Sequence, residues 1–293
     1  MRIVSMLPSA TEIVYALGRD DDLVGVTFEC NEPPRARLEK RIVVGGRDTS
    51  AMTPGDIDRY VRDQLAAGED LYTLDAGALA EIAPDVILTQ DLCRVCALPT
   101  DHVEDALDYL GCRADVISLD PHTLDDVLDS IKVVGKRLGV EPRADELVAG
   151  LRARLDAVAS RVAAQPRPRV AVLEWIDPPF TGGHWVPDLI TAAGGEPVAS
   201  DAGKHSRERS WDDILDARPD LVLVSPCGFG LDGAAVQAAV AVERLPGVPV
   251  WAIDADGLVV RPGPRLVEGV EAIAAAVHPD AFAPRPAGIR RIA

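Results

Sequence analysis

The sequence predicts an α/β protein with two Rossmann-like lobes, each built on a parallel sheet, joined by one long connecting α-helix, with a ligand cleft between the lobes. Two segments, Leu79–Thr89 and Ile214–Val224, share one pattern: a helix end, a Pro-Asp turn and a short apolar run. The proline ends the helix, and the apolar run suits a strand buried on both faces. A long helical pattern, from Pro142 to Ala164, separates the two copies. Ligands of open α/β sheets bind at the carboxyl ends of the strands, so two such sheets predict a cleft.

The composition is that of a soluble globular protein, and it argues against nucleic acid or an anionic membrane as the main partner. The 293 residues suffice for two domains with their own cores, and 47% of them are hydrophobic. Lysine and arginine number 30 against 47 aspartates and glutamates, which gives a net charge of −17. Nucleic acid and anionic membranes require a basic surface, so neither is expected as the partner.

The beginning of the chain predicts a cytoplasmic protein. A strand pattern starts at Arg2, without the basic segment, apolar segment and small-residue cleavage site of a secretory signal. No apolar stretch approaches the roughly 20 residues that a membrane span needs, so direct membrane insertion is not expected. Five cysteines, an odd number without a disulfide framework, favour reduced thiols.

The first lobe is predicted to span residues 1–139. A capping box from Ser9 to Glu12 is expected to open a helix that ends at Gly18. Strand and helix patterns then alternate, which predicts βαβ units and a parallel sheet. The expected strands are Ile3–Met6, Leu23–Thr27, Val86–Thr89 and Asp115–Leu119.

The connecting helix is predicted within residues 140–166 and the second lobe within residues 167–283. Pro142 suits the first turn of the helix, and Pro166 ends it. Residues 284–293 carry proline, glycine and arginine without an apolar period, which predicts a disordered tail. The expected elements of the second lobe are strands Arg169–Trp175, Leu221–Val224 and Val250–Ile253 and helices Val186–Ala193 and Pro264–Val277.

Aromatic and polar side chains follow the predicted strands, where the cleft is expected. Trp175, Trp185 and Phe229 would supply the flat apolar walls of a small-molecule pocket, although such tryptophans also pack in hinges or cores. His184 follows two glycines, which would let the backbone approach a ligand, and precedes the amino end of a helix, which favours an anionic group. The polar residues that follow strands of the first lobe are Glu29, Gln90 and Asp91.

Four of the five cysteines also follow predicted strands, and several interpretations remain open. Cys93 and Cys96 have the C-x-x-C spacing that chelates a soft metal ion or forms a reactive disulfide, and Cys30 and Cys227 would complete such a site. The same pair also suits two half-buried loop thiols or direct contact with a ligand. Cys112 is expected to be structural. The alternative function is therefore a cysteine-dependent metal or redox protein.

The sequence predicts no enzyme. It contains no Walker A sequence, no G-x-G-x-x-G after a strand, no G-x-S-x-G and no H-E-x-x-H. Glu174 or Asp91 could act as a base in an enzyme that converts a corrinoid or tetrapyrrole. A carboxylate at a strand end, however, is more often a cap or a hydrogen-bond acceptor.

Three runs, Ile3–Gly18, Leu23–Val26 and Asp177–Gly183, resemble the class III substrate-binding proteins of ABC transporters, and most closely the cobalamin-binding branch of the iron–siderophore/vitamin B12 group. The resemblance covers about residues 2–282. It implies two Rossmann-like lobes, a rigid helical spine and reversible binding of a corrinoid, tetrapyrrole or metal chelate. Four further segments resemble a leaderless subgroup usually labelled cobalamin-binding: Thr89–Cys96, Gly183–Pro187, Ser225–Phe229 and Arg261–Leu266.

Departures from the transporter pattern argue against docking on an ABC permease. The resemblance implies one acidic docking residue in each lobe. Asp212 fills this position in the second lobe, whereas Gly77 occupies it in the first. Aliphatic residues 258–260 also stand where aromatic residues often face the ligand.

We therefore expect a cytoplasmic, non-catalytic protein that captures cobalamin or a related corrinoid in the cleft, with a metal ion at the cysteines as the alternative. The candidate ligand-binding residues are Pro8, Glu29, Gln90, Asp91, Trp175, Phe180, His184, Trp185, Phe229 and Arg261.

Overall fold

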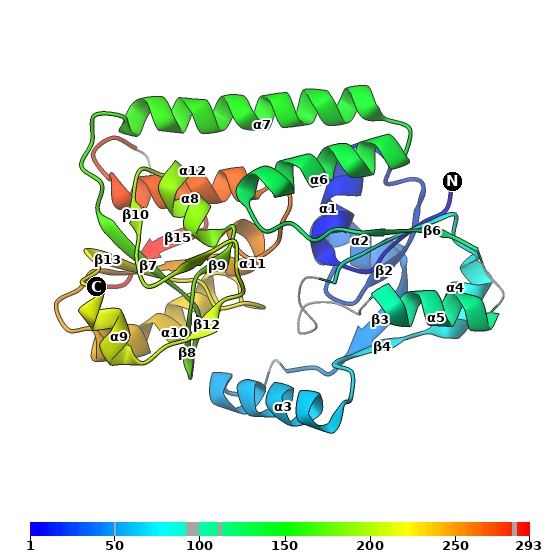
Figure 1. The fold of residues 1–293 in the computed structure, drawn as a ribbon, viewed down its shortest axis with the longest axis horizontal. Helices are drawn as coiled ribbons and strands as arrows, with labels where there is room; N and C mark the ends of the chain where they lie inside the picture. Colours follow the sequence, from blue (N-terminus) through cyan, green and yellow to red (C-terminus); the bar gives the residue numbers. More distant parts are fainter. Residues whose placement is uncertain (50, 92–99, 111–112, 283–285) are drawn as a thin grey trace. The chain divides into compact units, whose positions relative to one another are not determined.

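The computed structural model describes residues 1–49, 51–91, 100–110, 113–282 and 286–293, which form two compact α/β units (Figure 1). Unit 1 comprises residues 1–120 and 130–145, and unit 2 comprises residues 121–129 and 146–293. Two helices, α6 (Leu124–Arg137) and α7 (Glu141–Val162), contribute residues to both units. The α/β fold class is confirmed, while the boundaries at residues 139 and 166 stay predictions. Within the described ranges, no helix has both the length and the apolarity required to cross a membrane.

Unit 1 is built on a six-stranded sheet with the order β4-β3-β2-β1-β5-β6. Its neighbouring strands are parallel except β3 and β4, which are antiparallel. Apolar side chains of α4 and α5 share one core cluster with those of β1, β3 and β5. The strands are β1 (Ile3–Ser5), β2 (Leu23–Thr27), β3 (Arg41–Gly46), β4 (Tyr72–Leu74), β5 (Val86–Thr89) and β6 (Asp115–Ser118). The helices are α1 (Pro8–Ala16), α2 (Pro34–Glu39), α3 (Pro54–Ala67), α4 (Ala76–Ile82) and α5 (Thr100–Leu110).

Unit 2 contains a larger sheet with the order β12-β8-β7-β13-β14-β15, to which β10 adds by pairing with β7, and a separate two-stranded sheet of β9 and β11. Helix α10 covers one face of the larger sheet, and α8 and α12 lie side by side on the other (Figure 1). The strands are β7 (Arg169–Ile176), β8 (Pro179–Thr181), β9 (Gly183–His184), β10 (Glu196–Pro197), β11 (Asp201–Ala202), β12 (Arg207–Glu208), β13 (Leu221–Val224), β14 (Val250–Ile253) and β15 (Ile289–Arg291). The helices are α8 (Val186–Ala192), α9 (Trp211–Asp216), α10 (Leu231–Arg244), α11 (Ala255–Leu258) and α12 (Leu266–Val277).

The duplicated Pro-Asp turn makes the same hydrogen bonds in both units. In unit 1, the Arg2 amide donates to Asp85 Oδ2 at 2.7 Å, and in unit 2 the Arg169 amide donates to Asp220 Oδ2, also at 2.7 Å. The guanidinium of each arginine also donates to a carbonyl at the end of the preceding helix. Each aspartate therefore joins the start of a central strand to the strand that follows the turn. Every residue of those following strands, β5 and β13, is buried, as the apolar runs predicted.

Two local predictions are wrong. The capping box at Ser9 does not form, because α1 begins at Pro8, with Leu7 at the N-cap. Proline suits the first helical position since its fixed φ is already helical and its missing N–H would be unpaired there. A capping box does form at Ser210 of α9, where the Ser210 and Asp213 side chains each bond the other's backbone amide.

The predicted disordered tail is also wrong for the part that the structure describes. Strand β15 pairs antiparallel with β14, with Ile289 opposite Ile253. Backbone bonds between Val250 and residues 292 and 293 extend this pairing. Backbone pairing and one apolar contact are enough to hold an edge strand. A strand of three residues is too short to show an apolar period in the sequence, so β15 could not be predicted from it.

Candidate functional site

In unit 1, the predicted site residues lie just after strands, and two of them, Glu29 and Asp91, accept hydrogen bonds there. Glu29, half-buried after β2, accepts a bond from the Tyr72 hydroxyl at 3.4 Å. Asp91, exposed after β5, accepts from the Thr100 amide at 2.7 Å. Gln90 is 6% exposed, and Pro8 opens α1 with part of its surface exposed. These residues shape the loops that follow β1, β2 and β5.

The two described candidate cysteines lie in contrasting environments. Cys30 is fully buried, with its Sγ 3.1 Å from Thr11 Oγ1 and 3.4 Å from Thr27 Oγ1, whereas Cys227 in unit 2 is exposed. Cys93 and Cys96 lie outside the described residues. Among the residues that the structure describes, no group of three or more histidine, cysteine or acidic side chains is placed to hold a metal ion. The described geometry therefore gives no support to the metal or redox alternative.

An aromatic pair lies at the carboxyl ends of two neighbouring strands of unit 2. Strand β13 pairs with β7, and the ring centroids of Trp175, at the end of β7, and Phe229, after β13, are 6.0 Å apart. Both side chains keep part of their surface exposed. The Trp175 indole N–H donates to Asp177 O at 3.1 Å, which fixes the ring, and Phe180 of β8 stands opposite Trp175 in the sheet. The two ring planes are inclined at 53° to each other, so the pair forms a partly exposed, angled apolar surface.

The loop that carries Phe229 is held by Asp256 and Arg261. Asp256 Oδ1 accepts the Gly228 amide at 3.0 Å, and Asp256 Oδ2 pairs with Arg261 Nη2 at 3.1 Å. The Arg261 and Asp256 side chains are only 12% and 19% exposed. Burial raises the pKa of Asp256, and the Arg261 charge opposes that shift. Arg261, predicted as a polar ligand contact, therefore also positions this loop, a role shared with Asp256 that the sequence did not reveal.

Trp185 lies in the core. Its side chain is 5% exposed, and its indole N–H donates to Val259 O at 2.8 Å. Its ring stacks on the His184 ring, with centroids 5.6 Å apart and planes 28° apart. Of the two interpretations of this tryptophan, the structure shows the packing role, and the packed indole supports His184.

Three histidines of unit 2, here called the histidine cluster, gather around β9: His122, His184 and His205. The His184 ring centroid lies 4.8 Å from that of His205 and 5.9 Å from that of His122. His122 and His205 are exposed, whereas His184 is partly buried. Its Nε2 atom is buried and has no hydrogen-bond partner among the described residues. His184 also has a φ of 45°, a left-handed conformation that is uncommon outside glycine.

His184 is uncharged at neutral pH. Burial lowers its pKa to about 4, and the neighbouring imidazoles of His205 and His122 contribute to the same shift. Desolvation penalises the charged form of histidine, and a second cationic ring nearby would repel it. One ring nitrogen therefore keeps its lone pair over the physiological pH range.

Gly183 is required by the chain itself rather than by a ligand. A Cβ at this position would lie 2.3 Å from the Ser206 amide nitrogen and 2.7 Å from Lys204 O. The His184 amide donates to Lys204 O at 2.6 Å, and the Gly183 amide donates to Glu174 Oε1 at 2.7 Å. The glycine lets residues 204–206 run directly against β9, which brings His205 beside His184. The expectation that the two glycines approach a ligand finds no support at Gly183.

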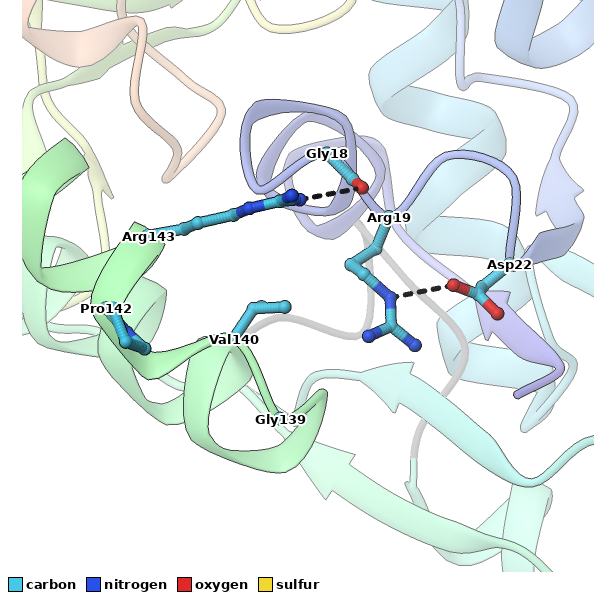
Figure 2. A pocket seen from close by; sticks show the side chains of 7 residues that line it. All are labelled: Gly18, Arg19, Asp22, Gly139, Val140, Pro142 and Arg143. Atoms are coloured by element: carbon cyan, nitrogen blue, oxygen red, sulfur yellow. Dashed lines mark hydrogen bonds and ion pairs between the residues drawn. The ribbon is translucent and has the colours of Figure 1, made fainter.

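A separate open depression lies in unit 1 and contains none of the predicted site residues (Figure 2). Residues that follow the end of α1 and residues around the turn between α6 and α7 line this depression. Arg19 pairs with Asp22 at 2.7 Å, and Arg143 donates to the Leu17 and Gly18 carbonyls at 3.2 Å. Both guanidinium groups therefore serve to hold the helix ends.

Two compact α/β units, with aromatic and polar side chains at the strand ends, define a ligand-binding protein of the two-unit α/β class. The sequence model of the periplasmic binding protein family matches residues 3–252, and the chain belongs to that family.

Relatives and solved structures match over most of the chain. It is 25% identical to an uncharacterised ABC transporter substrate-binding lipoprotein of Bacillus subtilis, over 96% of this chain and 81% of that protein. It is 26% identical to a vitamin B12-binding protein of Vibrio cholerae, over 93% of this chain and 87% of that protein. A crystal structure of a periplasmic heme-binding protein from Pseudomonas aeruginosa has a TM-score of 0.71 at 23% identity, covering 99% of this chain and 97% of that one. That structural likeness shows the shared fold.

Proposed function

We propose that the chain reversibly captures a flat, metal-carrying macrocycle, namely cobalamin or a related corrinoid or tetrapyrrole, without converting it chemically. The observation that carries the proposal is the partly exposed Trp175–Phe229 pair, 6.0 Å apart at the ends of neighbouring strands. Because the ring planes are inclined at 53°, one ring can lie against the face of a macrocycle while the other contacts its edge. Relatives named for vitamin B12 and heme support the same ligand class.

Capture without catalysis is supported by the state of the carboxylates that an enzyme would use. Glu174 accepts the Gly183 amide at 2.7 Å, and Asp91 accepts the Thr100 amide at 2.7 Å. Each carboxylate thus stabilises a loop, as expected for caps and acceptors at strand ends.

Titration of the purified protein with hydroxocobalamin, cyanocobalamin and hemin, read by calorimetry and absorbance, tests the proposal. We expect a Kd of about 10 µM or tighter for at least one of them, with the ligand recovered unchanged. Trp175→Leu and Phe229→Leu are expected to weaken binding about tenfold each, which corresponds to about 1.4 kcal/mol. The matched control is Trp211→Leu, a partly buried tryptophan of α9 packed against the core. Absence of binding by all three ligands would contradict the proposal.

The cytoplasmic location and the transporter partner are separate proposals. Fractionation of cells that produce the tagged full-length chain tests the location. Asp212 is exposed in the first turn of α9, where a permease contact would fall by family resemblance. The family implies a transporter partner, and we propose that docking on an ABC permease is weak for this chain, because Gly77 offers no second acidic contact in unit 1. Recovery of a permease in a cross-linked complex, lost in Asp212→Ala, would overturn this.

A further inference from the structure

We propose that His184 binds the metal centre of the captured macrocycle as an axial nitrogen ligand. The inference rests on the proposed function and adds the atom that holds the ligand's metal. The uncommon feature of His184 is an imidazole Nε2 that is buried and makes no hydrogen bond to any described residue. Leaving a buried polar atom without a partner is unfavourable, so such an atom normally has a bond partner.

The geometry around the ring suits a ligand to a metal that arrives already coordinated. The described residues contain no group of three metal-ligating side chains, so this part of the chain offers no site for a free ion. A macrocycle supplies the equatorial donors itself, and one imidazole then completes the coordination. Neutral imidazole is a common ligand for both cobalt and iron.

The backbone and the core hold the His184 ring in place. Its φ of 45° is a strained conformation, of the kind that persists where the surroundings enforce it and that clusters at functional sites. The Trp185 ring stacks against it from the core, and the Trp185 indole is itself tied to Val259 O. A ring supported on one side by the core has its orientation set before the ligand arrives.

The other two histidines pack around the His184 ring. The His205 and His122 rings contact the His184 ring at centroid distances of 4.8 and 5.9 Å, and both side chains are exposed. Exposed side chains change rotamer on the picosecond to nanosecond timescale, so these rings can turn aside without disturbing the core. In the binding step, the imidazole nitrogen donates its lone pair to the metal and a metal-bound water leaves. No electron is transferred.

Aquocobinamide tests the step, since both of its axial positions carry exchangeable ligands. We expect wild-type protein to shift its visible bands, and His184→Asn to lose the shift and to bind at least tenfold more weakly. Asparagine tolerates a positive φ better than most residues and is a poor metal ligand, so the backbone is preserved. Cyanocobalamin, whose upper axial position is filled by cyanide, should bind both proteins within about threefold. The same measurements with hemin show whether the chain prefers a tetrapyrrole or a corrinoid.

A second measurement identifies the bound nitrogen directly. With cob(II)inamide bound, an axial nitrogen splits the electron paramagnetic resonance lines into triplets, and protein labelled with 15N-histidine should give doublets. His102→Asn, at a partly exposed histidine of unit 1 that lies 3.1 Å from Asp70, is the matched control and should leave the splitting intact. Triplets that persist in His184→Asn, or are lost in the control, would overturn the inference. So would normal cyanocobalamin binding without any band shift by aquocobinamide, a result that leaves the proposed function standing. If none of the macrocycles binds, both fail.

Discussion

The pKa of His184 predicts that the stability of the ligand-free protein depends on pH in a way that one substitution removes. The pKa is lowered to about 4 in the folded state, from an ordinary value of 6.5. Between these two values the unfolded chain holds a proton at this residue that the folded chain does not. The free energy of unfolding therefore falls as the pH falls from about 6.5 to about 4. His184→Asn, which does not titrate, should lack this contribution.

The magnitude follows from the size of the shift. One pKa unit corresponds to 1.36 kcal/mol, so the full shift would be worth about 3 kcal/mol. The ring is only partly buried, and solvent screens its interaction with the rings of His205 and His122, so about half of this value is expected. Wild type should thus lose roughly 1.5 kcal/mol more than His184→Asn between pH 7 and pH 4.

Urea unfolding of both proteins at half-unit steps from pH 7 to pH 4 measures this difference. The acidic groups of the chain titrate in both proteins and cancel in the comparison. Gly150→Ala, which adds a methyl group in open space on α7, is the control and should show the same pH dependence as wild type within about 0.5 kcal/mol. A gap between wild type and His184→Asn that stays constant with pH would refute the reasoning. So would a titration of the His184 ring, followed by NMR, with a midpoint near 6.5.

Two further predictions concern the scaffold. Gly183→Ala should destabilise the protein by about 3 kcal/mol or more, because its Cβ would lie 2.3 Å from the Ser206 amide nitrogen. Gly150→Ala, which has open space around it on α7, should be neutral or stabilising by up to about 1 kcal/mol. Thermal unfolding measures both variants, and equal effects would contradict the geometry. Asp220→Asn should cost about 1 kcal/mol, because it weakens the bond that the carboxylate accepts from the Arg169 amide; urea unfolding that matches wild type would show that this bond adds nothing.

The fold was predictable because its strongest signals are local. Each Pro-Asp turn ends a helix by steric exclusion, and the apolar run after it has to be buried, so β5 and β13 follow from a few adjacent residues. The sequence did not reveal that Arg2, just before β1, and Arg169, the first residue of β7, each donate a hydrogen bond to the aspartate of the turn in their own unit. That bond joins residues far apart in the chain, and its existence depends on the strand order.

The site was less predictable, because its parts come from segments without a shared pattern. His122 lies in the loop between β6 and α6, and His205 lies between β11 and β12, so the two come from segments far apart in the chain. The one sequence signal for the histidine cluster was the rarity of histidine, since the chain has only five. Trp185 was ambiguous for a physical reason: an indole can face a ligand or donate to a buried carbonyl, and only the position of Val259 decides between them.

Gly183 shows how a correct local rule can lead to a wrong assignment. The absence of a Cβ does permit a close approach, but the approaching group is the backbone of residues 204–206. That contact places His205 beside His184, so the glycine contributes to the site through the histidine cluster and not by touching the ligand. If this is correct, Gly183→Ala should disturb the ring contacts of His184 as well as stability. Its NMR titration midpoint should then move up from about 4 toward 6.5, because the displaced segment would no longer bury the ring.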